Sequence, residues 1–284
     1  MNSKVHRFER QLRKAGPLPG FGLTLGITLT WLSLIVLIPL LALLLKSAGL
    51  GAHAWWAIAS DGRVLAALKL SFGSALIAAL IDTVIGTLIA WVLVRYRFPG
   101  RALFDALIDL PFALPTAVAG IALTAIYAGN GWLGHALESL GIKIAYAPAG
   151  IIVALIFIGL PFAVRTLQPV LENLHLEHED AAASLGATRF TTLRKIVLPQ
   201  ILPAMLTGFS LAFARGVGEY GSVIFIAGNL PYVSEIAPLL IVIRLEEFDT
   251  HGATVIATLM LGASFLILFL INTVQRRLAR GQSV

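Results

Sequence analysis

EHEDAAASLGATRFTTLRKIVLP, residues 177–199, is the longest charged stretch in an otherwise apolar chain. The alanines that follow Asp180 favour a short helix, and Gly186 is typical of the position just beyond a helix end. Thr188 can cap a second helix that begins at Arg189. The stretch therefore predicts two helices that meet at a glycine elbow, although an ordinary cytoplasmic loop would have a similar composition.

The composition of the chain is that of a membrane protein. Of its 284 residues, 58% are hydrophobic and 13% are charged, and its mean hydropathy is +0.88. Soluble domains carry about 25% charged residues, so we predict an all-α polytopic membrane protein. The net charge of +6 does not indicate nucleic acid, because Lys and Arg lie at the ends of apolar segments. The absence of cysteine excludes disulfides and thiolate metal sites.

Six apolar segments are long enough to cross a bilayer, which takes about 20 residues. They cover residues 21–45, 68–94, 103–127, 149–171, 201–226 and 253–274, and the last five form a core of residues 64–275. The first is longer than the apolar core of a secretory signal, which has about 7 to 15 residues, so it is expected to be an uncleaved span. Basic residues concentrate in segments 1–20, 95–101, 172–200 and 276–284, which predicts that these segments and both termini are cytoplasmic.

Two features interrupt this regular pattern. Pro111 and Pro115 each remove a backbone hydrogen bond from the third span, so the freed carbonyls must face protein or a watery cavity. The apolar run 236–243, between the fifth and sixth spans, is too short to cross a bilayer and is expected to be interfacial or re-entrant.

Charged residues within the spans are candidates for function. A carboxylate at the depth of Asp82 costs at least about 2.5 kcal/mol unless it faces protein or water, so Asp82 is expected to face inward. It is either a structural hydrogen-bonding group or part of a substrate path. Arg215 and Glu219 are four residues apart, so they stack on one face and can neutralise each other. This pair is either a tie between helices or part of the transport path.

Nucleotide motifs give no site on this chain. Gly216-x-Gly218-x-x-Gly221 matches a dinucleotide fingerprint, but no strand precedes it and it lies in an apolar span, so its glycines are expected to allow close helix contact. No Gly-x-x-x-x-Gly-Lys-Ser/Thr sequence occurs. Any ATP that drives transport would therefore be hydrolysed by another polypeptide.

Two further constellations are weak indications of catalysis. His175-x-Glu177-His178 lacks the residue order of zinc proteases and lies in a solvated charged run, so no metal site is expected. Asp105 and Asp109 share a helix face, but an intramembrane aspartyl protease needs two carboxylates that converge on one water, usually from separate helices. We therefore expect no catalytic residues.

The spacing within residues 177–199 resembles the EAA signature of the permease subunits of ABC importers. The matching residues are Glu179, Asp180, Ala181, Ala182, Gly186, Ile196, Leu198 and Pro199. Asp180 stands where the family usually has Glu, with Glu179 just before it, so no particular salt bridge is carried over to Asp180. The resemblance implies that this loop couples the permease to a groove of a separate ATPase.

A second resemblance spans nearly the whole chain, from residue 17 to residue 276. The segments that look like permeases for tetrahedral oxyanions are 95–101, 109–120, 215–221, 224–229 and 244–249. Residues 18–21 point to the T-type subunit of the sulfate and thiosulfate members.

These resemblances imply a type I ABC importer permease fold in a bacterial inner membrane, and import of sulfate or thiosulfate. The implied partners are a homologous W-type permease, two copies of a cytoplasmic ATPase and a periplasmic binding protein. ATP and Mg²⁺ would be bound by the ATPase, and this chain would bind no cofactor. Molybdate or another oxyanion is the alternative substrate. A secondary transporter, with Asp82 or Glu219 as a proton site, is the alternative of another class.

Overall fold

The computed structural model describes residues 21–174 and 176–280, and the regular elements in these ranges are helices. Five of the described helical stretches are long and apolar enough to span a membrane, and α8 (Thr116–Tyr127) with α9 (Trp132–Ser139) adds a sixth if this bent pair is one span. The predicted all-α polytopic class is therefore confirmed. The chain separates into two compact units, Met1–Ala52 and His53–Val284. The predicted cytoplasmic segment 1–20 lies outside the described residues.

The first unit contains one apolar helical stretch, Phe21–Ala48. It consists of α2 (Phe21–Leu32), the π-helical turn η1 (Ser33–Leu37) and α3 (Ile38–Ala48). The stretch begins where the sequence predicts the first span and ends almost one turn later than residue 45. A short helix, α4 (Ala52–Ala59), follows it along the chain.

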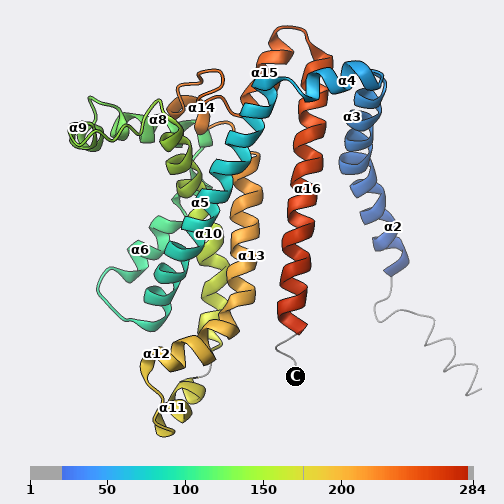
Figure 1. Ribbon diagram of the computed structural model, residues 1–284. Coiled ribbons are helices and arrows are strands. Elements are labelled where there is room, and N and C mark those ends of the chain that lie inside the picture. The colour runs from blue at the N-terminus through green and yellow to red at the C-terminus, as the bar shows by residue number, and fades with distance from the viewer. Residues whose placement is uncertain (1–20, 175, 281–284) are drawn as a thin grey trace, which may run out of the picture. The chain divides into compact units, whose positions relative to one another are not determined.

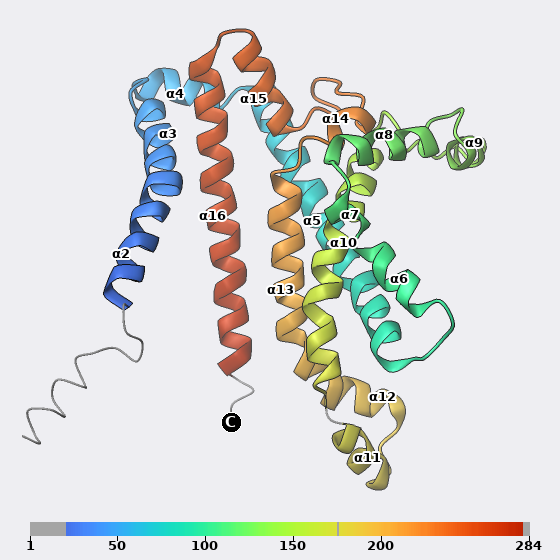
Figure 2. The ribbon, with the colours of Figure 1, turned by 180° about the vertical axis from the view of Figure 1, so that it is seen from behind.

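Three long helices of the second unit, α5 (Gly62–Arg95), α10 (Pro148–Glu172) and α13 (Leu198–Val217), lie side by side (Figure 1 and Figure 2). The first of them begins at a cap, because Asp61 accepts hydrogen bonds from the amides of Arg63 at 2.8 Å and Val64 at 3.2 Å. These three helices carry most of the predicted second, fourth and fifth spans.

Small residues let the three helices approach one another closely. A Cβ placed on Gly86 of α5 or on Gly208 of α13 would press against Ala163 of α10. Larger side chains fill the adjoining core, where Leu155 and Phe213 are buried. The helix backbones can therefore approach each other closely. In lipid the hydrophobic effect does not drive helices together, and close packing of this kind is what holds them.

The third predicted span, 103–127, is not one helix, and the sequence prediction is corrected here. Its residues form α6 (Arg101–Ile108), α7 (Leu110–Ala113) and α8 (Thr116–Tyr127), and α9 (Trp132–Ser139) follows with a bend of 48°. Leu114 is extended, with φ −85° and ψ 135°, as the residue before a proline prefers. Pro115 thus breaks the span instead of only bending it.

The fifth predicted span, 201–226, differs from the structure at both ends. α12 (Arg189–Thr192), the π-helical turn η2 (Leu193–Val197) and α13 form one helical stretch, Arg189–Val217, so the second half of the predicted loop 172–200 already belongs to a span. At the other end the helix stops at Val217, and α14 (Val223–Ile226) is separate. Between the two helices, the Glu219 carboxylate accepts the amide hydrogen of Ser222 just before α14 begins.

Both π-helical turns have the same local cause. η1 directly precedes Ile38-Pro39, and η2 directly precedes Leu198-Pro199. A proline donates no amide hydrogen, so the ladder of hydrogen bonds must shift on its N-terminal side. The helix continues through each proline with a widened turn.

The segment between the fifth and sixth spans contains α15 (Ala237–Glu246), which packs against α5 and α16 (Thr250–Arg280). It covers the apolar run 236–243 from its second residue, and its ten residues are too few to cross a bilayer. Polar bonds fix its start to α5, because Arg63 donates to the buried Glu235 carboxylate at 2.7 and 2.8 Å and the Ala237 amide donates to Ser71 Oγ at 2.8 Å.

The last helix, α16 (Thr250–Arg280), is longer than the predicted sixth span and includes the first part of the predicted tail 276–284. The rest of that tail, residues 281–284, lies outside the described residues. Gln275 joins α16 to α13 by donating to Thr207 Oγ1 at 2.6 Å and to the Pro203 carbonyl at 3.3 Å.

Candidate functional site

The elbow is built by a glycine turn between α11 (Leu176–Ser184) and α12. Gly186 has a φ of +78°, and its amide donates to the Ala183 carbonyl at 2.9 Å. The next amide, that of Ala187, reaches back to the Ala182 carbonyl at 3.0 Å. Such paired bonds end a helix at a left-handed residue, usually glycine. The two helices therefore meet at Gly186, as the sequence predicts.

The elbow has two arms: the first is α11, and the second is α12 with η2. The second arm begins at the predicted cap. Thr188 is extended, with φ −74° and ψ 157°, and its Oγ1 accepts a hydrogen bond from the Thr191 amide at 3.3 Å. The hydroxyl satisfies one of the amides that the first turn of a helix leaves free. Together the glycine turn and the cap fix the direction in which each arm leaves the elbow.

The eight residues of the predicted coupling loop are distributed over both arms. Glu179, Asp180, Ala181 and Ala182 lie on α11, Gly186 forms the turn, Ile196 lies in η2, and Leu198 and Pro199 begin α13. The two neighbouring acids differ, because Asp180 is exposed whereas Glu179 accepts a hydrogen bond from Arg95 at 2.6 Å. Their part in docking an ATPase stays a prediction.

The elbow also exposes two large apolar side chains that the sequence reasoning missed. Leu185 is 89% exposed and Phe190 is 70% exposed, and they flank Gly186 on either side. Between the arms lies a hollow lined by Ala181, Ala182 and other residues of both arms. The sequence feature that could have indicated this exposed apolar surface is the occurrence of Leu185 and Phe190 near a glycine within a charged stretch.

The second candidate site is the ion pair near the end of α13. Arg215 Nη1 lies 2.5 Å from Glu219 Oε2, and the other carboxylate oxygen accepts hydrogen bonds from the Ser222 amide at 2.9 Å and from its hydroxyl at 3.0 Å. The Glu219 side chain is 2% exposed and that of Arg215 is 34% exposed. A buried, fully engaged carboxylate therefore holds a guanidinium that stays partly accessible.

Glycines bring other backbone segments close to this pair. A Cβ on Gly221 would collide with the Thr116 side chain, and a Cβ on Gly120 would collide with the backbone of Ser222. Gly216 lies against Ala75 of α5. The predicted role of the glycine motif in close contact is thus confirmed at Gly216 and Gly221, whereas Gly218 has open space around it and ends α13.

Asp82 is buried, as predicted, with 1% of its surface exposed. It lies on α5 against α10, where a Cβ on Gly159 would collide with Oδ2 of Asp82. Neither carboxylate oxygen has a hydrogen-bond partner among the described residues. Its two predicted roles, in structure or in a substrate path, stay predictions.

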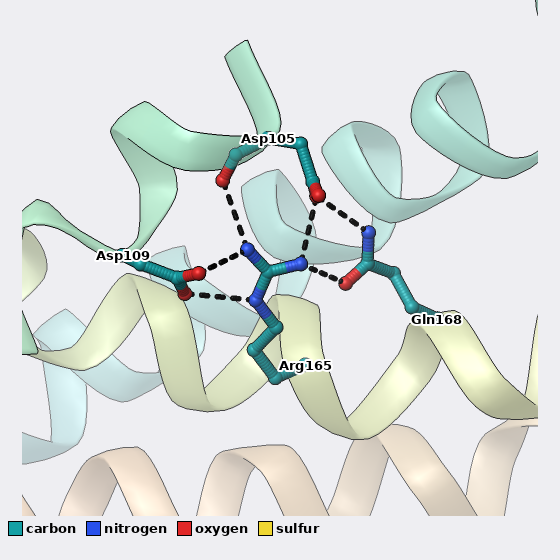
Figure 3. A network of polar contacts seen from close by, with 4 residues as sticks. All are labelled: Asp105, Asp109, Arg165 and Gln168. Carbon is teal, nitrogen blue, oxygen red and sulfur yellow. Dashed lines mark hydrogen bonds and ion pairs between the residues drawn. The ribbon is translucent and has the colours of Figure 1, made fainter. Parts of the chain in front are cut away.

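Asp105 and Asp109 take part in a polar network, shown in Figure 3, that sequence analysis did not identify. Arg165 of α10 holds both Asp109 oxygens, at 2.8 and 2.6 Å, and one Asp105 oxygen at 2.7 Å. Gln168 bridges Arg165 and Asp105. The guanidinium therefore separates the two carboxylates and ties α6 and α7 to α10 beside the break in the third span.

We expect Arg165→Met to loosen this tie. The substitution leaves two carboxylates without their shared donor, and hydrogen bonds to charged groups contribute about 2 kcal/mol. Thermal unfolding in detergent should therefore occur at a lower temperature. Arg165→Lys should recover less than half of the loss, because an ammonium cannot form the bidentate contact to Asp109. An unchanged unfolding temperature for Arg165→Met would show that the network does not hold α6 in place.

Comparison with known proteins identifies the family. The model for "Binding-protein-dependent transport system inner membrane component" matches residues 82–284. The chain is similar to the sulfate transport system permease protein CysT of Salmonella typhimurium, with 49% identity over 263 residues that cover 93% of this chain and 95% of the relative.

Solved structures agree on the fold. A bacterial ABC transporter involved in the import of the acidic polysaccharide alginate gives a TM-score of 0.74 at 14% identity, over 95% of this chain and 99% of that one. The alginate transporter in complex with an alginate-bound periplasmic protein gives 0.73 at 16% identity, over 89% and 93%. The chain belongs to the family of binding-protein-dependent transport system inner membrane components.

Proposed function

We propose that this chain is one of two membrane-spanning subunits of an ATP-driven importer that moves sulfate or thiosulfate into the cytoplasm. The 49% identity to a sulfate permease over nearly the full chain carries this proposal. The proposed second subunit is a homologous W-type permease. A periplasmic binding protein would deliver the anion. The similar alginate transporter, solved in complex with a periplasmic protein, supports this part of the proposal.

The elbow supports a mechanism in which the energy comes from another polypeptide. Leu185 and Phe190 expose apolar surface at its tip, and Arg189, Arg194 and Lys195 add exposed positive charge to the second arm. A partner with an apolar groove and an acidic rim would bury the first group and pair with the second. We propose that two copies of an ATPase, which bind ATP and Mg²⁺, dock at the elbows of the two permeases. This chain is proposed to bind no cofactor itself.

Arg215 supports a path for an anion. Its guanidinium is one-third exposed and is held in place by Glu219, so it can offer charge-assisted hydrogen bonds to sulfate oxygens. Because Glu219 neutralises the charge, the attraction for the anion would be modest. We propose a transient contact, which suits a transporter that must release its substrate.

The proposal places both termini in the cytoplasm, and cysteine labelling tests this orientation. The chain has no cysteine, and Ser60, Arg97, Ser139 and Ser184 are exposed. We expect a cysteine at Ser60 or Ser139 to react with a membrane-impermeant maleimide added from the periplasmic side. A cysteine at Arg97 or Ser184 should react only after the membrane is permeabilised. Reversed labelling would overturn the orientation.

The transport function is tested by reconstitution of this chain with its second permease, ATPase and binding protein in proteoliposomes. We expect sulfate uptake that requires ATP and the binding protein. Thiosulfate should compete for uptake, and molybdate should compete more weakly. Sulfate uptake by this chain alone, driven by a proton gradient, would contradict the proposal and favour a secondary transporter. Uptake of molybdate in preference to sulfate would correct the substrate.

A further inference from the structure

The end of α5 is joined to the first arm of the elbow by an ion pair. Arg95, the last residue of α5, donates from Nη2 to Oε1 of Glu179 on α11 at 2.6 Å. The guanidinium also lies 5.2 Å from the ring centroid of Trp91, one turn earlier on α5. The side chains of Arg95 and Glu179 are 14% and 27% exposed, so the pair is largely shielded from water. Shielding strengthens such a contact relative to a pair on an open surface.

Around this ion pair, α5 and the elbow are separated by a hollow. A cavity of about 400 Å³ is lined by Trp91 of α5 and by residues of both arms, among them Glu179, Asp180 and Arg189. α11 itself packs against α12 and η2. Beside this hollow, the Arg95–Glu179 ion pair joins α11 directly to the end of α5.

The surroundings of Arg95 make the contact costly to lose. Its Nε is buried and has no hydrogen-bond partner among the described residues. A cation at the C-terminal end of a helix is favoured by the helix dipole, which keeps the charge at this position. Without Glu179 the guanidinium would be a largely buried cation without an anionic partner, a state that costs more than an open surface charge.

We propose that Arg95 is a positioning residue for the elbow. Through Glu179 it holds α11 at a fixed angle to α5, so that a movement imposed on the elbow also moves α5. This inference rests on the proposed function, in which the ATPase docks at the elbow. Docking would then move the membrane-spanning helices through the Arg95–Glu179 contact with α5 as well as through the continuous helix from α12 into α13.

The test uses the complete assembly in proteoliposomes and measures sulfate transported per ATP hydrolysed. We expect Arg95→Met and Glu179→Gln each to lower this ratio by about fivefold, which corresponds to a weak coupling between two sites. The double variant should be no worse than either single variant, because both remove the same contact. Arg95→Lys should recover part of the ratio. Arg97→Met is the matched control, because it removes an exposed arginine two residues away and should leave the ratio unchanged.

The ratio separates positioning from a merely structural role. A substitution that only lowers the amount of assembled transporter lowers transport and ATP hydrolysis together. The inference is overturned if Arg95→Met behaves like Arg97→Met. It is also overturned if the effects of Arg95→Met and Glu179→Gln multiply in the double variant, because Glu179 would then act on the ATPase independently of Arg95.

A distance measurement keeps the inference testable apart from the proposed function. Cysteines replacing the exposed Tyr96 and Ser184 can carry a pair of spin labels in this cysteine-free chain. We expect one narrow distance distribution, and a broad one after Arg95→Met. An equally narrow distribution in the variant would overturn the inference. If the wild-type assembly shows no sulfate-dependent ATP hydrolysis, the proposed function fails, and the spin-label result still decides whether Arg95 positions the elbow.

Discussion

Replacing Gly186 by valine should yield a chain that inserts into the membrane but supports far less sulfate uptake. Gly186 has a φ of +78°, and a β-branched residue in this conformation costs about 2 kcal/mol. Open space surrounds the position, so the penalty comes from the backbone and not from a clash. Because each 1.4 kcal/mol is a factor of ten, uptake should fall by roughly tenfold or more.

Gly186→Asn is the matched control for this prediction. Asparagine tolerates the left-handed conformation, and the open space accepts its side chain. We therefore expect Gly186→Asn to take up sulfate at nearly the wild-type rate. The wild type and both variants should be present in the membrane in equal amounts. Normal uptake by Gly186→Val, with the ATPase bound, would show that the glycine turn is not needed for coupling.

The largest loss of stability is expected for Arg215→Met. Its partner Glu219 is 2% exposed, so the variant leaves a carboxylate in the interior without its counterion. Breaking such a buried pair costs about 3 kcal/mol, even though the two hydrogen bonds from Ser222 remain. Glu219→Gln should cost less, because the Arg215 left behind is one-third exposed. Thermal unfolding of the purified chain in detergent measures both effects.

The double variant separates a structural tie from a role in transport. Arg215→Met with Glu219→Gln removes both charges, so stability should largely return. If Arg215 contacts the anion as proposed, sulfate uptake should stay low in this folded variant, because the path would lack a charge-assisted donor. Lys69→Met is a control for the loss of a positive charge within a span, since Lys69 is exposed. Wild-type uptake by the double variant would remove Arg215 from the path.

Local sequence signals predicted the elbow well because each depends on neighbouring residues. Gly186 and Thr188 act through backbone bonds to residues at most five positions away, so their roles follow from the sequence. The burial of Asp82 was also predictable, because a carboxylate in an apolar span has few other options. The contact between Arg215 and Glu219 follows from their spacing in the same way.

Long-range contacts could not be predicted in this way. The Arg165 network joins residues 56 and 60 positions apart, and nothing near Asp105 or Asp109 indicates which helix supplies the guanidinium. The ends of the fifth span were misplaced for a related reason. Hydropathy does not reveal that the charged residues after Thr188 continue a helix, or that α13 ends at Val217 within an apolar run.

α12, η2 and α13 form one continuous helical stretch, so the second arm of the elbow and Arg215 lie near its opposite ends. The stretch has 29 residues. At 1.5 Å per residue it is about 44 Å long, so a tilt of about 5° around one end displaces the other by roughly 4 Å. That displacement exceeds the length of the hydrogen bonds an anion would make with Arg215. Under the proposed function, a small rotation of the elbow by a docked ATPase would be enough to withdraw the guanidinium from an anion at the far end of the same helix.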